Sequence, residues 1–113
     1  MLIKKSESLA KNIGPNCTVW EYKGNSEILS SARSVINGRL PEKGTFKNSE
    51  CEEVYFVVSG SGKVISDKGT FELNQGDVYH FEKGEKYYVK GNDLNLVISN
   101  SPKREPRQFE IIE

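Results

Sequence analysis

The sequence contains little cysteine, a single histidine and no long apolar run. Among 113 residues, only Cys17 and Cys51 carry thiols, and His80 is the one imidazole. No stretch approaches the roughly 18 apolar residues that a membrane-spanning helix needs, so no membrane partner is expected. Residues 1–14 include charges but lack the apolar stretch of a signal peptide. We therefore place the protein in the cytoplasm, with both thiols reduced.

The charge of the chain is balanced. Lys and Arg total 16, Asp and Glu total 16, and the net charge is zero. Binding to nucleic acid depends on an excess of positive charge that releases counterions from the phosphates, so no nucleic-acid partner is expected. With 113 residues, the chain has room for one domain with a single modest core.

Glycines divide the second half of the chain into short segments rich in Val, Ile, Tyr and Phe. This spacing of glycines and short apolar segments is typical of β-strands joined by tight turns. We predict strands at 18–22, 34–37, 53–58, 63–66, 70–73, 77–81, 86–90 and 94–99. The pattern predicts an all-β sandwich or barrel.

Two segments interrupt this pattern. The apolar residues of 28–36 also fit a helical stripe, but a lone helix there would interrupt the series of strands, so a strand is favoured. The tail 102–107 is charged and broken by two prolines, and we expect it to lie over the surface.

The spacing of one carboxylate and several glycines resembles the cupin family. Glu53 is followed by Gly60, and Gly76-Asp77 by Gly84, as at the end of the first cupin motif and in the frame of the second. The resemblance implies an antiparallel double-stranded β-helix, the cupin-type jelly-roll barrel. It implies one domain over 1–113 with a core at about 34–99, on which the N-terminal strands and the C-terminal tail pack.

The chain departs from cupins at the metal ligands, which in that family are three histidines and one glutamate. Only the glutamate, Glu53, is kept. One register of the first motif places Lys47 and Ser49 at two histidine positions, and the other places Phe46 and Asn48 there. Tyr87 takes the place of the third histidine. One carboxylate among neutral oxygens is a poor metal site, so no metal and no cofactor are expected.

Several polar residues are candidates for a ligand-binding cavity in the barrel. Strand alternation and the family frame direct Glu53, Tyr55 and Tyr87 inward. The predicted ligand-binding residues are Glu53, Tyr55, Tyr87, Lys47, Asn48, Ser49 and Arg39. The alternative interpretations are a structural hydrogen bond or ion pair for Glu53, core packing for the tyrosines and a solvated hairpin for Arg39.

His80 and Cys51 are weaker candidates for chemistry. The family frame turns His80 away from the cavity. Cys51 lies between acidic neighbours, Glu50 on one side and Glu52 and Glu53 on the other, whose negative charge is expected to raise the pKa of its thiol. Neither residue is therefore predicted to be catalytic.

The resemblance and the candidate cavity predict a metal-independent protein that binds a small polar molecule, a sugar or an organic acid. One alternative is a metal-independent isomerase, epimerase or lyase, with Glu53 as general base and Tyr87 or Lys47 as acid. Another is a degenerate fold retained for self-association. Because small cupins often dimerise through edge strands, 18–22 is expected to form a homodimer that buries the face around Trp20 or His80.

Overall fold

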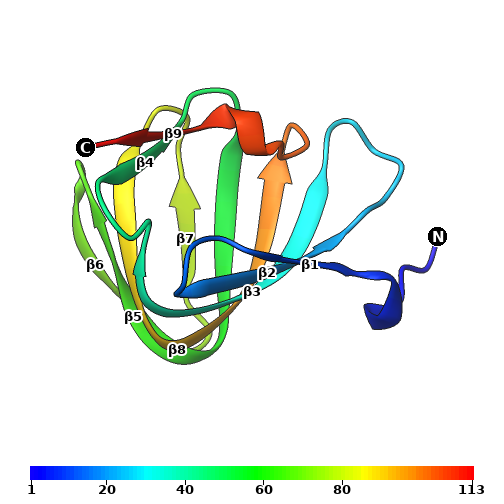
Figure 1. The fold of residues 1–113 in the computed structure, drawn as a ribbon, viewed down its shortest axis with the longest axis horizontal. Helices are drawn as coiled ribbons and strands as arrows, with labels where there is room; N and C mark the ends of the chain where they lie inside the picture. The colour runs from blue at the N-terminus through cyan, green and yellow to red at the C-terminus, as the bar shows by residue number, and fades with distance from the viewer.

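Two long antiparallel strands, β5 (Glu52–Ser66) and β8 (Lys86–Ser101), pair along nearly their whole length. Their register runs from Glu52 opposite Ser101 to Ser66 opposite Tyr87. A computed structural model, which describes residues 1–113, shows the other strands arranged about this pair in one curled sheet (Figure 1). The antiparallel all-β fold predicted from the sequence is confirmed.

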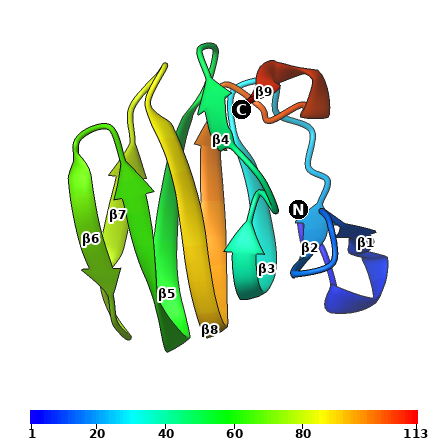
Figure 2. The same cartoon turned by 60° about the vertical axis from the view of Figure 1, so that its left-hand side comes forward.

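The remaining elements extend the sheet on both sides of β5 and β8. They are η1 (Lys5–Glu7), β1 (Leu9–Asn12), β2 (Cys17–Tyr22), β3 (Ser30–Leu40), β4 (Thr45–Asn48), β6 (Gly69–Leu73), β7 (Val78–Phe81), η2 (Pro106–Gln108) and β9 (Phe109–Ile112). Strand β8 pairs with β3 and β4, while β5 pairs with β6 and β7 (Figure 2). No helix in the structure has the length and apolar character to cross a membrane.

Alternate residues of the long strands face the interior of the curl. Sixteen buried apolar side chains form one core, and its fully enclosed members are Ile36, Val57, Val64, Val89, Leu94 and Leu96. This alternation follows from the two-residue period of a strand, which sends successive side chains to opposite faces, and it is interrupted where the register shifts around Ser59.

Three of the glycines that suggested strand ends, Gly60, Gly62 and Gly91, lie inside the long strands. Gly60 has a φ of 79°, and a Cβ there would lie 1.9 Å from the Asp93 carbonyl oxygen. A Cβ on Gly91 would lie 2.3 Å from the Ile36 carbonyl oxygen. These glycines allow close backbone approach where the strands bend. The division of 53–66 and 86–99 into four separate strands was therefore wrong.

Residues 28–36 contain the start of strand β3 rather than a helix, as predicted, although Ile28 and Leu29 precede it and are exposed. Strands β1, β4 and β9 were not predicted. All four residues of β1 are exposed, so the strand has no buried face. Its sequence therefore lacks the alternation of apolar and polar residues by which a strand is predicted. Because β1 pairs along β2, the segment 18–22 is not the sheet edge that the sequence suggested.

Candidate functional site

A cavity of about 350 Å³ opens into the barrel. Most of its lining residues are apolar, and its polar and ionisable groups include Lys11, Ser34, Glu53, Tyr55, Tyr87 and Arg104. A mostly apolar wall with a few converging polar groups is the usual form of a small-molecule site.

Glu53 is the carboxylate of this cavity. Its side chain comes from the inward face of β5 and is only 6% exposed. Burial raises the pKa of Glu53 from 4.5 to about 7, although the positive charge of Arg104 and the side chains of Asn100 and Tyr87 act to lower it. The Asn100 amide has this effect although its Nδ2 makes no hydrogen bond of standard geometry. The carboxyl is therefore half ionised near neutral pH.

Tyr87 is the hydroxyl partner of Glu53. Its O–H donates a long hydrogen bond of 3.5 Å to Glu53 Oε2. Tyr55 lines the same cavity, and the Phe81 ring packs against both tyrosines, with centroid distances of 4.7 Å to Tyr55 and 4.1 Å to Tyr87. Burial, and then the charge of Glu53, raises both tyrosine pKa values well above 10, so the hydroxyls remain protonated donors.

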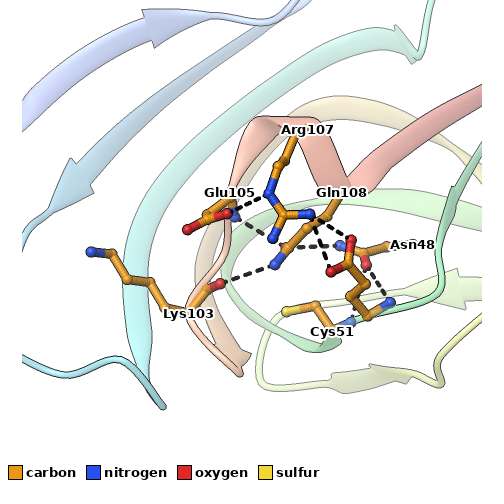
Figure 3. Close-up of polar contacts among 7 residues, drawn as sticks. Asn48, Cys51, Lys103, Glu105, Arg107 and Gln108 are labelled. Carbon is orange, nitrogen blue, oxygen red and sulfur yellow. Dashed lines mark hydrogen bonds and ion pairs between the residues drawn. The ribbon is translucent and has the colours of Figure 1, made fainter.

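The C-terminal tail brings Arg104 to the cavity. Gln108 is buried, and its side chain donates to the Lys103 carbonyl at 3.2 Å and accepts from the Glu105 N–H at 3.0 Å. Asn48, at the end of β4, donates to Gln108 Oε1 at 3.4 Å. Figure 3 shows these amide contacts joining the tail to the β4–β5 connection. The tail is thus part of the structure around the site as well as a surface segment.

Comparison with known proteins agrees with this architecture. The family model described as the Cupin domain matches residues 40–96, half of the chain. The chain belongs to the cupin family. No curated protein matches it in sequence.

Several solved structures share the cupin fold of this chain. Streptomyces PAC13, as a tyrosine-to-phenylalanine variant with uridine, is 15% identical, with a TM-score of 0.89 over 100% of this chain and 90% of that one. A further Pac13 structure, 15% identical with a TM-score of 0.88 over 100% and 91% of the two chains, is described as a unique nucleoside dehydratase. KdgF from Halomonas sp. is 15% identical, with a TM-score of 0.77 over 95% and 97% of the two chains. These likenesses confirm the jelly-roll barrel.

The donor set of this cupin does not fit the metal site of the family. Of the two registers, the structure selects Phe46 and Asn48 as inward-facing. Phe46 offers no ligand atom, and Asn48 Oδ1 already accepts the backbone N–H groups of Glu50 and Cys51, both at 3.0 Å. No three His, Cys, Asp or Glu side chains gather closely enough to hold a metal ion. Glu53 would thus be the single anionic ligand.

The structure brings Glu53, Tyr55 and Tyr87 together in one cavity, and their role in binding a ligand stays a prediction. The other four predicted residues lie outside its wall, which corrects their placement. Lys47 projects from the opposite face to Phe46 and Asn48, because strand alternation separates it from them. Ser49 lies in the exposed bend that follows β4. Asn48 faces inward but is taken up by the tail and the β4–β5 connection.

Arg39 is also engaged away from the cavity. Its guanidinium donates to the carbonyl oxygens of Pro41 at 2.7 Å and Gly44 at 2.8 Å, and it lies 3.9 Å from the centroid of the Tyr88 ring. Arg39 therefore stabilises the β3–β4 turn and lies outside the cavity wall.

Sequence reasoning missed Lys11, Arg104 and Phe109 as cavity residues. Lys11 lies on the unpredicted strand β1, and Arg104 lies in the tail. Phe109 begins β9, whose pairing with β4 brings the end of the chain back over the barrel. No local pattern in the sequence marks these residues, because their positions depend on pairing between distant segments.

The outward position of His80 was predicted correctly. The raised pKa of the Cys51 thiol was also predicted, but its main cause was not. His80 is on the outer face, where its Nε2 lies 2.8 Å from Glu52 Oε1. The pKa of the Cys51 thiol is raised, but burial is the main cause, and among its acidic neighbours only the charge of Glu53 contributes. Both Cys17 and Cys51 are buried, unpaired thiols.

The raised pKa of Glu53 predicts a pH-dependent change in stability. Between pH 4.5 and about 7 the folded chain keeps the Glu53 proton while the unfolded chain loses it, so stability falls as the pH rises through this window. Relative to Glu53→Gln, the wild-type free energy of unfolding should fall by about 3 kcal/mol from pH 4 to pH 8. Chemical denaturation of both proteins across this range measures the difference.

The exposed carboxylate of Glu72 provides the control for this measurement. Glu72→Gln should follow the wild type at every pH, because that side chain is solvated in both states. A difference between wild type and Glu53→Gln that does not change with pH would show that the carboxyl is ionised normally in the fold.

Proposed function

We propose that this cupin binds a small polyhydroxylated molecule with a ring, a nucleoside or a sugar, and eliminates water from it without a metal. The observation that carries the proposal is the Glu53 carboxyl, with a pKa of about 7, in contact with the Tyr87 hydroxyl at 3.5 Å in a cavity of about 350 Å³. Acid–base turnover needs such a second group within reach of the base.

The likeness to Pac13, described as a nucleoside dehydratase, supports the choice of reaction and of first ligand to test. At 15% identity that likeness establishes the fold alone. It adds to the proposal because the cavity of this chain has the groups that an elimination requires.

The elimination uses Glu53 and Tyr87 in one cycle. The Glu53 carboxylate takes a proton from a carbon next to a carbonyl group of the substrate, and the electron pair of that C–H bond becomes a carbon–carbon double bond. The C–O bond on the neighbouring carbon breaks, and its hydroxyl leaves as water with the proton of Tyr87. Tyr87 then regains a proton from Glu53, which restores both groups.

A binding protein without turnover is the second candidate. The raised pKa values of Tyr55 and Tyr87 favour it, because a phenol with a high pKa keeps its proton for hydrogen bonding to a ligand and is a weak acid. The third interpretation, a fold kept only for self-association, calls for a filled barrel. The cavity argues against it.

We predict that the protein converts nucleosides or sugars bearing an aldehyde or keto group into dehydrated products, seen by mass spectrometry as the loss of one water. Glu53→Gln should lower kcat by about a hundredfold or more, since the general base is removed. Tyr87→Phe should lower it by about tenfold, and a chelator should have no effect.

Glu52→Gln is the matched control for this experiment, because Glu52 is the neighbouring residue but lies on the outer face. It should leave kcat unchanged. If the wild type binds uridine by calorimetry yet dehydrates no carbonyl compound in the panel, the enzyme proposal is wrong and the binding protein is the better description.

We also propose that the chain forms a homodimer through the outer face of β7, β5 and β8. Val78, Phe56 and Val97 lie side by side in adjacent strands and are 59%, 44% and 40% exposed. Continuing this row, Arg33 lies opposite Val97 and packs over the Trp20 ring at 4.0 Å. Aligned exposed apolar side chains are typical of an interface between protein chains.

Sedimentation velocity at micromolar concentration tests the dimer. The wild type should sediment as a dimer and Phe56→Glu as a monomer, because the new charge would be buried in the interface. Thr70→Glu, on the edge strand β6, adds the same charge away from the row and should remain dimeric. A wild type that is monomeric at these concentrations contradicts the proposal.

A further inference from the structure

A second hollow, of about 230 Å³, adjoins the cavity. The two share Lys11, Ala32, Arg104 and Pro106 in their walls, so groups bound in the two hollows would lie close to each other. The cavity wall is mostly apolar, whereas the wall of the second hollow is mostly polar. We call the second one the polar hollow.

Positive side chains outnumber negative ones in the polar hollow. Its charged residues are Lys11, Lys23, Lys103, Arg104, Glu21 and Glu105. The four cations and two carboxylates leave an excess of two positive charges. In a chain whose net charge is zero, this excess is a local property of the hollow.

The carboxylates in the wall leave two lysines without a partner. Glu21 Oε1 contacts both Lys11 Nζ at 3.2 Å and Arg104 NH1 at 3.5 Å. Glu105 Oε2 accepts from Arg107 Nε at 2.8 Å, which draws it toward the tail network. No ion pair involves Lys23 or Lys103, and in Figure 3 the Lys103 side chain extends away from that network.

Arg104 is fixed between the two hollows. Its backbone N–H donates to Ser30 Oγ at 3.0 Å, and its guanidinium lies 4.7 Å from the centroid of the Phe109 ring. Its side chain is only 16% exposed. A guanidinium held in this way loses little conformational freedom when it binds an anion.

The polar hollow also contains a buried amide. Asn100 is 3% exposed, and its Nδ2 makes no hydrogen bond of standard geometry, although the amide acts on the Glu53 carboxyl from the cavity side. A buried N–H group without an acceptor is costly, and an acceptor on a ligand would remove that cost. The Ser30 hydroxyl, which accepts from Arg104, has its own proton free to donate beside it.

We propose that the ligand carries a phosphate monoester, which occupies the polar hollow while its ring lies in the cavity beside Glu53. A phosphate monoester has close to two negative charges and three acceptor oxygens at neutral pH. These match the excess of two positive charges and the unpartnered donors. The inference rests on the function proposed for the cavity, and it specifies a nucleotide or a sugar phosphate as the substrate class.

Calorimetry with three probes tests this assignment: uridine, uridine 5′-monophosphate and ribose 5-phosphate. The nucleotide should bind at least about tenfold more tightly than uridine at low ionic strength. The difference should shrink as salt is added, because the phosphate contacts are electrostatic. If ribose 5-phosphate also binds tightly, a sugar phosphate is sufficient for recognition and the base is not required.

The double variant Lys23→Gln/Lys103→Gln removes the two unpaired cations. It should abolish most of the preference for the nucleotide and leave uridine affinity unchanged, because neither lysine lines the cavity itself. Lys43→Gln/Lys83→Gln removes the same charge from exposed turns elsewhere and should keep the preference.

The possible results separate this inference from the proposed function. Equal affinity for uridine and its monophosphate would overturn the phosphate site and leave the cavity assignment intact. A preference that persists in Lys23→Gln/Lys103→Gln would overturn the placement of the phosphate in the polar hollow. Binding of ribose 5-phosphate through these lysines without binding of uridine would support the polar hollow and overturn the nucleoside as the ring in the cavity.

Discussion

The pairing of β5 with β8 determines which side chains reach the interior of this cupin. Because the two strands stay in antiparallel register over most of their length, Glu53 lies opposite Asn100 and Tyr55 opposite Ile98. The same pairing sends Tyr87 to the inner face at the other end of β8. A shift of one residue would move the carboxyl to solvent and Phe56 to the interior. The candidate site therefore depends on the same register as the core.

Placing a carboxyl in this interior has a physical consequence for the whole fold. Burial opposes ionisation of Glu53, and Arg104 is the main group whose charge favours it. Arg104 belongs to the tail, which is held by buried Gln108 and by Asn48 at the end of β4. The far end of the chain thus tunes the ionisation of a residue in its middle. Packing of the tail and ionisation of Glu53 are linked in this way.

The sequence predicted the parts of the site that strand alternation determines. The two-residue period shows which side chains share a face, and the resemblance to cupins indicates which face is inside. Together they direct Tyr55 and Tyr87 inward and His80 outward. It could not choose between Lys47 and Asn48, since that choice depends on the register of a four-residue strand. Lys11 and Arg104 were out of reach, because they reach the cavity from the exposed strand β1 and from the tail. Their partners are distant in the chain, and no local pattern encodes them.

The ionisation of Glu53 is the central claim of this account, and the carbon-13 resonance of its carboxyl group measures it directly. In a pH titration of labelled protein, the carboxyl assigned by its absence in Glu53→Gln should titrate with a midpoint near pH 7. In Arg104→Gln the midpoint should move higher, because the positive charge that favours the carboxylate is removed. A midpoint near 4.5 in the wild type would show a normally solvated carboxylate and contradict the account.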